Sequence, residues 1–220
     1  MKVPLNKKIL DKNEECALQN SDFFAKHNII CMNVISSPGS GKTTILSQTI
    51  RDLTGKTKIA VIEGDIRTDT DAKKIRETGA PAVQIETKGA CHLSAQQVTA
   101  ALSAIPATDM DIIFIENVGN LVCPSDFALG ENARVIVLSV PEGDDKPVKY
   151  PQTFAKADIV LINKIDLIDY IKFNMERVIA DIRAVNPDAK ILKISATTGE
   201  GMQDWYNWLA ENKQKTSTEK

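Results

Sequence analysis

The sequence predicts an α/β protein whose helices cover both faces of a doubly wound, mostly parallel sheet. One observation is a set of short apolar runs rich in β-branched residues, at 29–36, 58–64, 81–86, 111–117, 133–140, 158–164 and 189–195. Such runs suit strands that are buried on both faces. The other is that helical patterns separate them, at about 43–53, 68–78, 94–104, 148–157, 172–185 and 202–212. Ligands of such sheets bind at the carboxyl ends of the strands.

Composition limits the classes of function. The chain has 220 residues, 43% of them hydrophobic, and a net charge of −2 with acids and bases interspersed. We therefore expect an ordinary core and no nucleic-acid or membrane partner. No run of about 18 apolar residues is present, and the N-terminus lacks the apolar centre of a signal peptide, so we expect a cytoplasmic protein.

A phosphate-binding loop is predicted at 36–44, which reads SSPGSGKTT between a predicted strand and a predicted helix. Lys42 can reach the β- and γ-phosphates, and the Thr43 hydroxyl can bind Mg²⁺. Ser36 stands where the usual motif has its first glycine, and we expect it only to shape the turn. The backbone N–H groups that can converge on phosphate oxygens belong to Gly39, Ser40, Gly41, Lys42 and Thr43.

The segment NKID at 163–166 predicts a guanine site. A carboxylate at Asp166 can accept two hydrogen bonds from guanine, whereas adenine offers no such pair of donors. Lys164 can lie along the base, and Asn163 can tie this segment to the phosphate loop. The segment that begins with Ser195 and Ala196 can supply an N–H to the guanine oxygen. The predicted nucleotide is therefore GTP.

The acids near the phosphate loop predict Mg²⁺ binding and hydrolysis. Glu116 and Gly119 stand where GTPases carry Asp-x-x-Gly, so Glu116 can interact with Mg²⁺ and Gly119 can bind the γ-phosphate. Asp65 is a second candidate on the Mg²⁺ side, and Asp71 is the candidate that orients the attacking water. The alternative for Asp69 and Asp71 is that they only start a helix. No glutamine stands at the water-positioning place, so hydrolysis should be slow.

A third set of ligands is Cys91, His92 and Cys123. Thiolates and imidazole suit Zn²⁺ or Ni²⁺. Neighbouring residues can share one ion only from a loop, and three ligands leave one position open. Because Cys123 follows the segment that should sense the γ-phosphate, metal affinity would depend on the nucleotide. The alternative is two packed cysteines and a surface histidine, and packing is what we expect of Cys16 and Cys31.

Taken together, these segments make the chain resemble the HypB family of hydrogenase-maturation GTPases. The matching segments cover roughly 30–200 and include SSPGSGKTT, GACHL, IENVGNLVCP, PEGDDKPVKYP, NKIDL and SATTGEG. The resemblance implies a SIMIBI-type P-loop GTPase fold, GTP-dependent homodimerisation, slow hydrolysis and nickel delivery. It also implies a HypA-type accessory protein and the hydrogenase large subunit as partners. It places phosphate binding on Gly39 to Thr44 and metal binding on Cys91, His92 and Cys123, and makes Ser36 normal for the family.

We expect a helical N-terminal arm at 1–27, a P-loop GTPase domain at 28–212 and a polar tail at 213–220. Some members of the family carry an N-terminal cysteine cluster or a histidine-rich stretch, but residues 1–28 hold one cysteine and one histidine. Metal function is therefore expected at the site linked to the nucleotide.

Four other classes of protein are alternatives to a HypB-type GTPase. The urease-maturation GTPases carry a Cys-Pro-His motif, and here Cys91-His92 and Cys123-Pro124 stand apart. A metabolic kinase would transfer phosphate to an acceptor. A partitioning ATPase would carry a lysine in place of Ser37. A metal buffer with a structural GTP site would bind metal regardless of nucleotide.

Overall fold

A computed structural model describes residues 5–65, 69–87 and 89–218, and within these ranges seven parallel strands form one sheet. Its order is β3-β2-β4-β1-β5-β6-β7. The predicted fold class is confirmed, since every pairing is parallel. The strands are β1 (Ile30–Ser36), β2 (Ile59–Asp65), β3 (Ala82–Glu86), β4 (Ile112–Glu116), β5 (Ala133–Ser139), β6 (Ile159–Asn163) and β7 (Lys190–Lys193).

The helices follow the predicted stretches with two differences. The stretch at 148–157 is two short helices, because the residue before Pro151 is driven out of helical backbone. The last helix continues through part of the tail predicted for 213–220. The start of the helix predicted at 68–78 lies partly outside the described residues. The helices are α1 (Leu5–His27), α2 (Lys42–Leu53), α3 (Thr70–Arg76), α4 (Ala95–Leu102), α5 (Lys146–Lys149), α6 (Pro151–Ala155), α7 (Met175–Val185) and α8 (Met202–Thr218).

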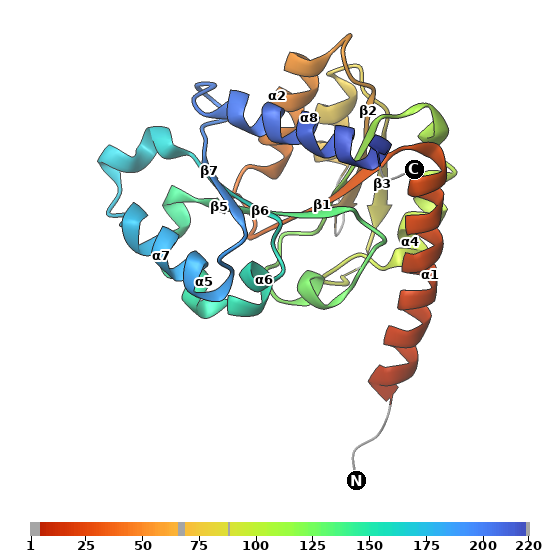
Figure 1. The fold of residues 1–220 in the computed structure, drawn as a ribbon, viewed down its shortest axis with the longest axis horizontal. Coiled ribbons are helices and arrows are strands. Elements are labelled where there is room, and N and C mark those ends of the chain that lie inside the picture. The colour runs from red at the N-terminus through yellow and green to blue at the C-terminus, as the bar shows by residue number, and fades with distance from the viewer. Residues whose placement is uncertain (1–4, 66–68, 88, 219–220) are drawn as a thin grey trace.

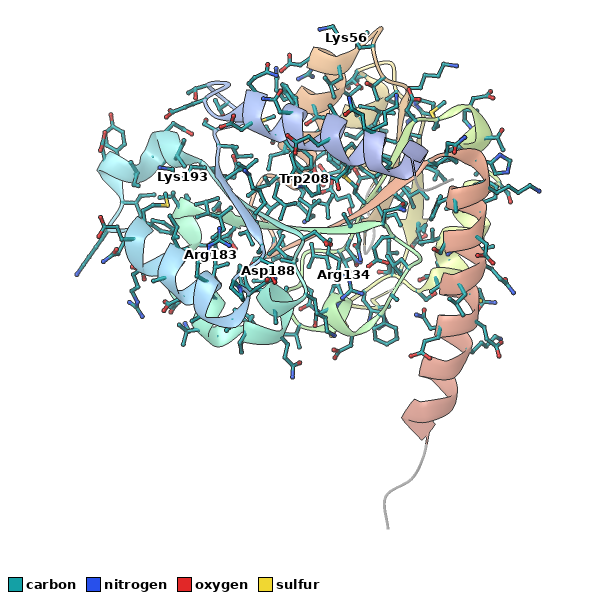
Figure 2. The ribbon with its side chains drawn as sticks, in the orientation of Figure 1. Lys56, Arg134, Arg183, Asp188, Lys193 and Trp208 are labelled. Carbon is teal, nitrogen blue, oxygen red and sulfur yellow. The ribbon has the colours of Figure 1, made fainter. Side chains whose placement is uncertain are left out.

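Helices cover both faces of the sheet. Figure 1 shows α2 and α8 above it and α5, α6 and α7 below it. The upper face packs against α2, α3 and α8, with Trp205 fully buried and Trp208, labelled in Figure 2, beside it. The lower face packs against α1 and α4 at one end and against α6 and α7 at the other. Burial on both faces explains why the strand sequences are continuously apolar.

The first helix is docked on the domain from Asn13 onward. The side chains of Asn13 and Asn20 are buried although they are polar. The Asn20 amide donates to the carbonyl oxygens of Ala95 and Leu129, both at 2.9 Å. Phe24 is fully buried in the core below the sheet. These contacts join α1 to α4 and to the loop before β5. None of the helices in the described ranges is long and apolar enough to span a membrane.

Replacing Gly130 with alanine should loosen this docking. Gly130 has φ +90°, and a Cβ there would lie 2.5 Å from the backbone oxygen of Ala17 in α1. Gly79 is a matched control, because its φ is +89° and its Cβ would meet nothing within 4 Å. Gly79→Ala should cost about 1 kcal/mol of unfolding free energy from the left-handed backbone alone. Gly130→Ala should cost about 1–3 kcal/mol more. Urea unfolding of both variants measures the difference, and equal losses would contradict the docking.

Candidate functional site

The carboxyl ends of the central strands open into a cleft of about 600 Å³. One wall is the phosphate loop with Lys42, Thr43 and Thr44, and another is formed by the ends of β2 and β4. The predicted site residues Asp65, Asp71, Gly119 and Lys164 also line it. Cys91 reaches the same cleft, so the cleft contains residues of both predicted sites.

The phosphate loop depends on two glycines with left-handed backbone. Gly39 has φ +79° and Gly41 has φ +98°. A Cβ on Gly41 would lie 2.5 Å from the amide nitrogen of Asn163. The loop ends where α2 begins at Lys42, so the helix N-terminus faces the space that the loop encloses. Backbone N–H groups and the helix dipole there favour an anion.

Ser36 does more than shape the turn that was expected of it. Among the described residues other than glycine, only Asn28 and Lys164 have positive φ, so the backbone of Ser36 is ordinary. Its hydroxyl accepts a hydrogen bond from Lys42 Nζ at 3.0 Å. Lys42 is buried, and its Nζ lies 3.9 Å from Glu116 Oε1. The serine that replaces the first glycine therefore helps to hold the loop lysine inside the cleft.

Two buried carboxyl groups form the floor on the Mg²⁺ side. Glu63 and Glu116 are register partners on β2 and β4, and both are buried. Burial, then the charge of Glu116 and a hydrogen bond with it, raise the pKa of Glu63 to about 11. Burial also raises the pKa of Glu116, although the charge of Lys42 opposes this. Glu63 is one of the acids at the end of the second predicted strand that the sequence places near the metal–phosphate side, although no role was predicted for it.

The donor set at this floor fits a hard divalent cation. The Thr43 hydroxyl donates to Glu116 Oε1 at 2.8 Å. Glu63 Oε1 and Glu116 Oε2 are buried without a hydrogen-bond partner in the part of the chain that the structure describes. Carboxylate and hydroxyl oxygens are the ligands that Mg²⁺ prefers. Asp65 ends β2 at the same cleft.

Asp71 lies in the first turn of α3, as its alternative interpretation expected, but it also lines the cleft. Its carboxylate forms an ion pair with Lys74 at 2.8 Å. Both side chains are half exposed, so this ion pair can open at little cost.

The predicted base site lies at the ends of β6 and β7, next to the phosphate loop. The amide of Asn163 donates to the Ser40 carbonyl at 2.9 Å, and its oxygen accepts from Ala196 N at 3.3 Å. Lys164 Nζ donates to the Gly39 carbonyl at 2.6 Å. Asp166 Oδ1 is buried and has no hydrogen-bond partner among the described residues. An unsatisfied carboxylate oxygen is costly unless a ligand supplies a donor.

In the segment after β7, the backbone N–H groups of Ser195 and Ala196 both donate hydrogen bonds within the protein. Ser195 is buried, and its N–H donates to the Glu200 carbonyl at 2.9 Å. The N–H of Ala196 is the group that binds Asn163. Donation from this segment to a guanine oxygen therefore stays a prediction.

Glu142 holds the other side of the phosphate loop and was not predicted. Its Oε2 accepts from the Ser40 hydroxyl at 2.6 Å, and from the N–H and hydroxyl of Ser139 at 2.8 and 2.7 Å. Ser40 is fully buried. The ends of β5 and β6 thus fix the middle of the loop from two sides.

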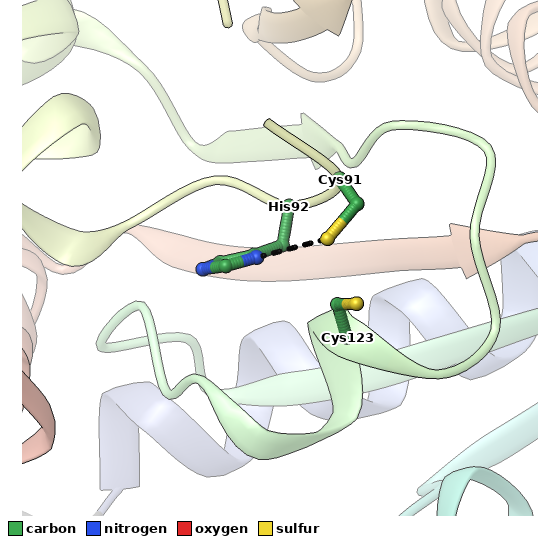
Figure 3. A group of neighbouring side chains, drawn as sticks. All are labelled: Cys91, His92 and Cys123. Atoms are coloured by element: carbon green, nitrogen blue, oxygen red, sulfur yellow. Dashed lines mark hydrogen bonds between the residues drawn. The ribbon is translucent and has the colours of Figure 1, made fainter. Parts of the chain in front are cut away.

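Cys91, His92 and Cys123 come together from two segments, as Figure 3 shows. Their ligand atoms all lie within 4.8 Å of one another. Cys91 Sγ is 3.6 Å from His92 Nδ1, and the imidazole stacks on Phe127 with ring centroids 3.8 Å apart. Cys91 and His92 lie in the loop before α4, and Cys123 is the first residue of a short 3₁₀ helix. Of the other cysteines, Cys31 is buried in the core as expected, and Cys16 is half-buried.

The electrostatics of this group suit a metal ion. Burial lowers the pKa of His92, which keeps the imidazole neutral and able to bind metal. A hydrogen bond with Cys123, together with partial burial, raises the pKa of the Cys91 thiol. A divalent cation would offset the repulsion between two thiolates at such short range.

The fold and this cleft define a P-loop nucleotide-binding protein that carries a second group of soft ligands. The nucleotide-binding domain family CobW/HypB/UreG matches residues 30–193. Hydrogenase maturation factor HypB of Escherichia coli K12 is 52% identical over 201 residues, which cover 91% of this chain and 69% of that protein. The chain therefore belongs to the HypB hydrogenase maturation factors.

Two further comparisons agree with this assignment. The hydrogenase/urease maturation factor HypB of Helicobacter pylori 26695 is 40% identical over 215 residues, 96% of this chain and 88% of that protein. The crystal structure of HypB from Helicobacter pylori in complex with nickel aligns with a TM-score of 0.88 at 39% identity. The alignment covers 93% of this chain and 96% of the Helicobacter pylori chain.

Proposed function

We propose that this chain is a GTP-dependent metallochaperone that delivers nickel during [NiFe]-hydrogenase maturation. The observation that carries the proposal is the shared cleft, in which Lys42 and Thr43 lie on one side and Cys91 on another. Membership of the HypB family supports the role in hydrogenase maturation. The nickel complex of a relative with the same fold supports nickel as the cargo.

The nucleotide is GTP in this proposal, and its hydrolysis to GDP is slow. Asp166 and Lys164 bind the base, and the loop from Gly39 to Thr44 binds the phosphates with Gly119. Thr43, Asp65 and Glu116 would hold Mg²⁺, which would neutralise phosphate charge when bound. Lys42 stabilises charge on the transferred phosphate. Asp71 orients the water after its weak ion pair with Lys74 opens.

The metal set acts as a transfer site in this proposal. Cys91, His92 and Cys123 supply three donors to Ni²⁺ or Zn²⁺, and a fourth position stays available to a partner. Those partners are a second copy of the chain in the GTP state, a HypA-type accessory protein and the hydrogenase large subunit, all in the cytoplasm. Binding would then differ between GTP and GDP, which distinguishes a metallochaperone from a metal buffer.

Nickel affinity should depend on the bound nucleotide. We expect the Kd for Ni²⁺ to differ about 5- to 150-fold between the GDP form and the form with a non-hydrolysable GTP analogue, the usual range of coupling between sites. Cys91→Ala, His92→Ala and Cys123→Ala should each weaken binding by about 100-fold or more, because a donor is lost. Titration of each variant with Ni²⁺ measures this, and ultracentrifugation follows the dimer. Cys16→Ala is the control, and nucleotide-independent affinity in the unaltered protein would contradict the proposal.

The base site should switch its preference when Asp166 becomes asparagine. Asp166→Asn removes the charged acceptor for guanine, so GTP affinity should fall by about 10- to 100-fold. Xanthosine triphosphate should then bind better than GTP, because its C2 carbonyl oxygen accepts a hydrogen bond where the guanine 2-amino group donates one. Asp169→Asn is the matched control, an exposed acid in the same turn. Competition against a fluorescent nucleotide gives both affinities. An unchanged preference for GTP would rule out Asp166 as the base ligand.

A further inference from the structure

Two asparagine side chains fasten the Cys91-His92 dipeptide to the loop that follows β4. The Asn120 amide donates to the Cys91 carbonyl at 3.2 Å. On the other side of the dipeptide, the N–H of Leu93 donates to the Asn117 side-chain oxygen, also at 3.2 Å. Both ends of the dipeptide are therefore held by one short loop, at 117–120.

The same loop also positions the third ligand. The side-chain oxygen of Asn120 accepts from Val122 N at 2.8 Å, immediately before Cys123. One side chain thus contacts both segments that carry the metal ligands. Asn117 is 1% exposed, and its amide donates to the side-chain oxygen of Asn33 on β1 at 3.2 Å. The loop is therefore anchored in the sheet at Asn117 and contacts the ligand segments at Asn120.

Gly119 lies between the two asparagines and touches the phosphate loop. A Cβ at Gly119 would lie 2.8 Å from the Pro38 ring and 2.9 Å from the Pro38 backbone. Three positions earlier in the chain, Glu116 accepts from Thr43. The loop therefore cannot shift near the phosphates without changing its contacts with Cys91 and Val122, because packed structures move between discrete arrangements.

We propose that Asn117 and Asn120 are positioning residues that transmit the nucleotide state to the metal site. This inference rests on the proposed function. A shift of the backbone at Gly119 toward or away from the nucleotide moves the two amides. They in turn change the spacing of Cys91, His92 and Cys123. Asn120 carries most of the link, because it is the side chain that contacts both ligand segments.

The test uses Asn120→Ala and Asn120→Asp, since Asn120 is only half-buried and its loss should leave the fold intact. The aspartate keeps an acceptor for Val122 N and loses the donor to Cys91 but adds a negative charge, so the uncharged alanine variant decides the effect on nickel affinity. Asn207→Ala is the matched control, an exposed asparagine in α8. Asn117→Ala is added with thermal unfolding as a check of folding. Each full-length variant is titrated with Ni²⁺ in the GDP form and in the GTP-analogue form, and its nucleotide affinity is measured separately.

Asn120→Ala should bind nickel about 10-fold more weakly, as is typical when a group that orients a ligand is removed. The ratio of Kd values between the two nucleotide forms should fall toward one. The sulfur-to-nickel absorption bands should no longer respond to the nucleotide, while nucleotide affinity and the Asn207→Ala control stay unchanged.

Two other results would overturn the inference, and they differ in what they say about the proposed function. If the unaltered protein shows coupling and both Asn120 variants keep the same ratio, the inference is overturned and the proposed function stands. If the unaltered protein shows no coupling, both are overturned.

Discussion

The rest of the cleft depends on the contacts that the buried carboxylate of Glu116 makes with Thr43 and Lys42. This carboxylate lies at the end of β4, next to the central strand β1, accepts from Thr43 at 2.8 Å and lies 3.9 Å from Lys42 Nζ. A charge this buried is tolerated only when cations and donors surround it. The phosphate loop supplies those groups, so the loop and the strand end must stay together. The chain then continues from Glu116 directly into the loop that holds the metal ligands.

The phosphate loop is held as firmly on its far side. Asn163 binds the Ser40 carbonyl, and Glu142 binds the Ser40 hydroxyl. These two contacts come from the ends of the neighbouring strands β5 and β6. A rigid loop on a buried sheet suits the precise placement of phosphate. The loop at 117–120, by comparison, is anchored in the sheet at Asn117, while Asn120 is half-buried and holds the ligand segments by two hydrogen bonds.

The strand plan could be predicted from the sequence because burial on both faces leaves a strong local signal. Each observed strand lies within its predicted apolar run, except that β2 extends one residue further to Asp65, and SSPGSGKTT falls at the β1–α2 junction. The break at Pro151 is also a local effect, but the helical pattern around it masked it. Other features were missed because they join residues far apart in the chain. The hydrogen bond between Ser40 and Glu142 joins residues 102 positions apart, and the sequence near either residue does not indicate the other.

The same reason explains what was missed at the metal site. Cys91, His92 and Cys123 could be selected by residue type, since few side chains bind soft metals. Asn120 lies 29 positions from Cys91, and an asparagine in a loop is too common to indicate a partner. The place of Glu63 near the metal–phosphate side could be predicted, but its pairing with Glu116 could not, because that depends on the register of β2 against β4.

The central claim is that one loop joins the nucleotide to the metal. X-ray absorption at the nickel edge tests it most directly, on nickel-loaded protein in the GDP form and in the GTP-analogue form. We expect two sulfur donors and one imidazole from the chain in the GDP form, and a changed sulfur shell with the analogue. Identical nickel spectra in the two forms, with both nucleotides shown to be bound, would contradict it.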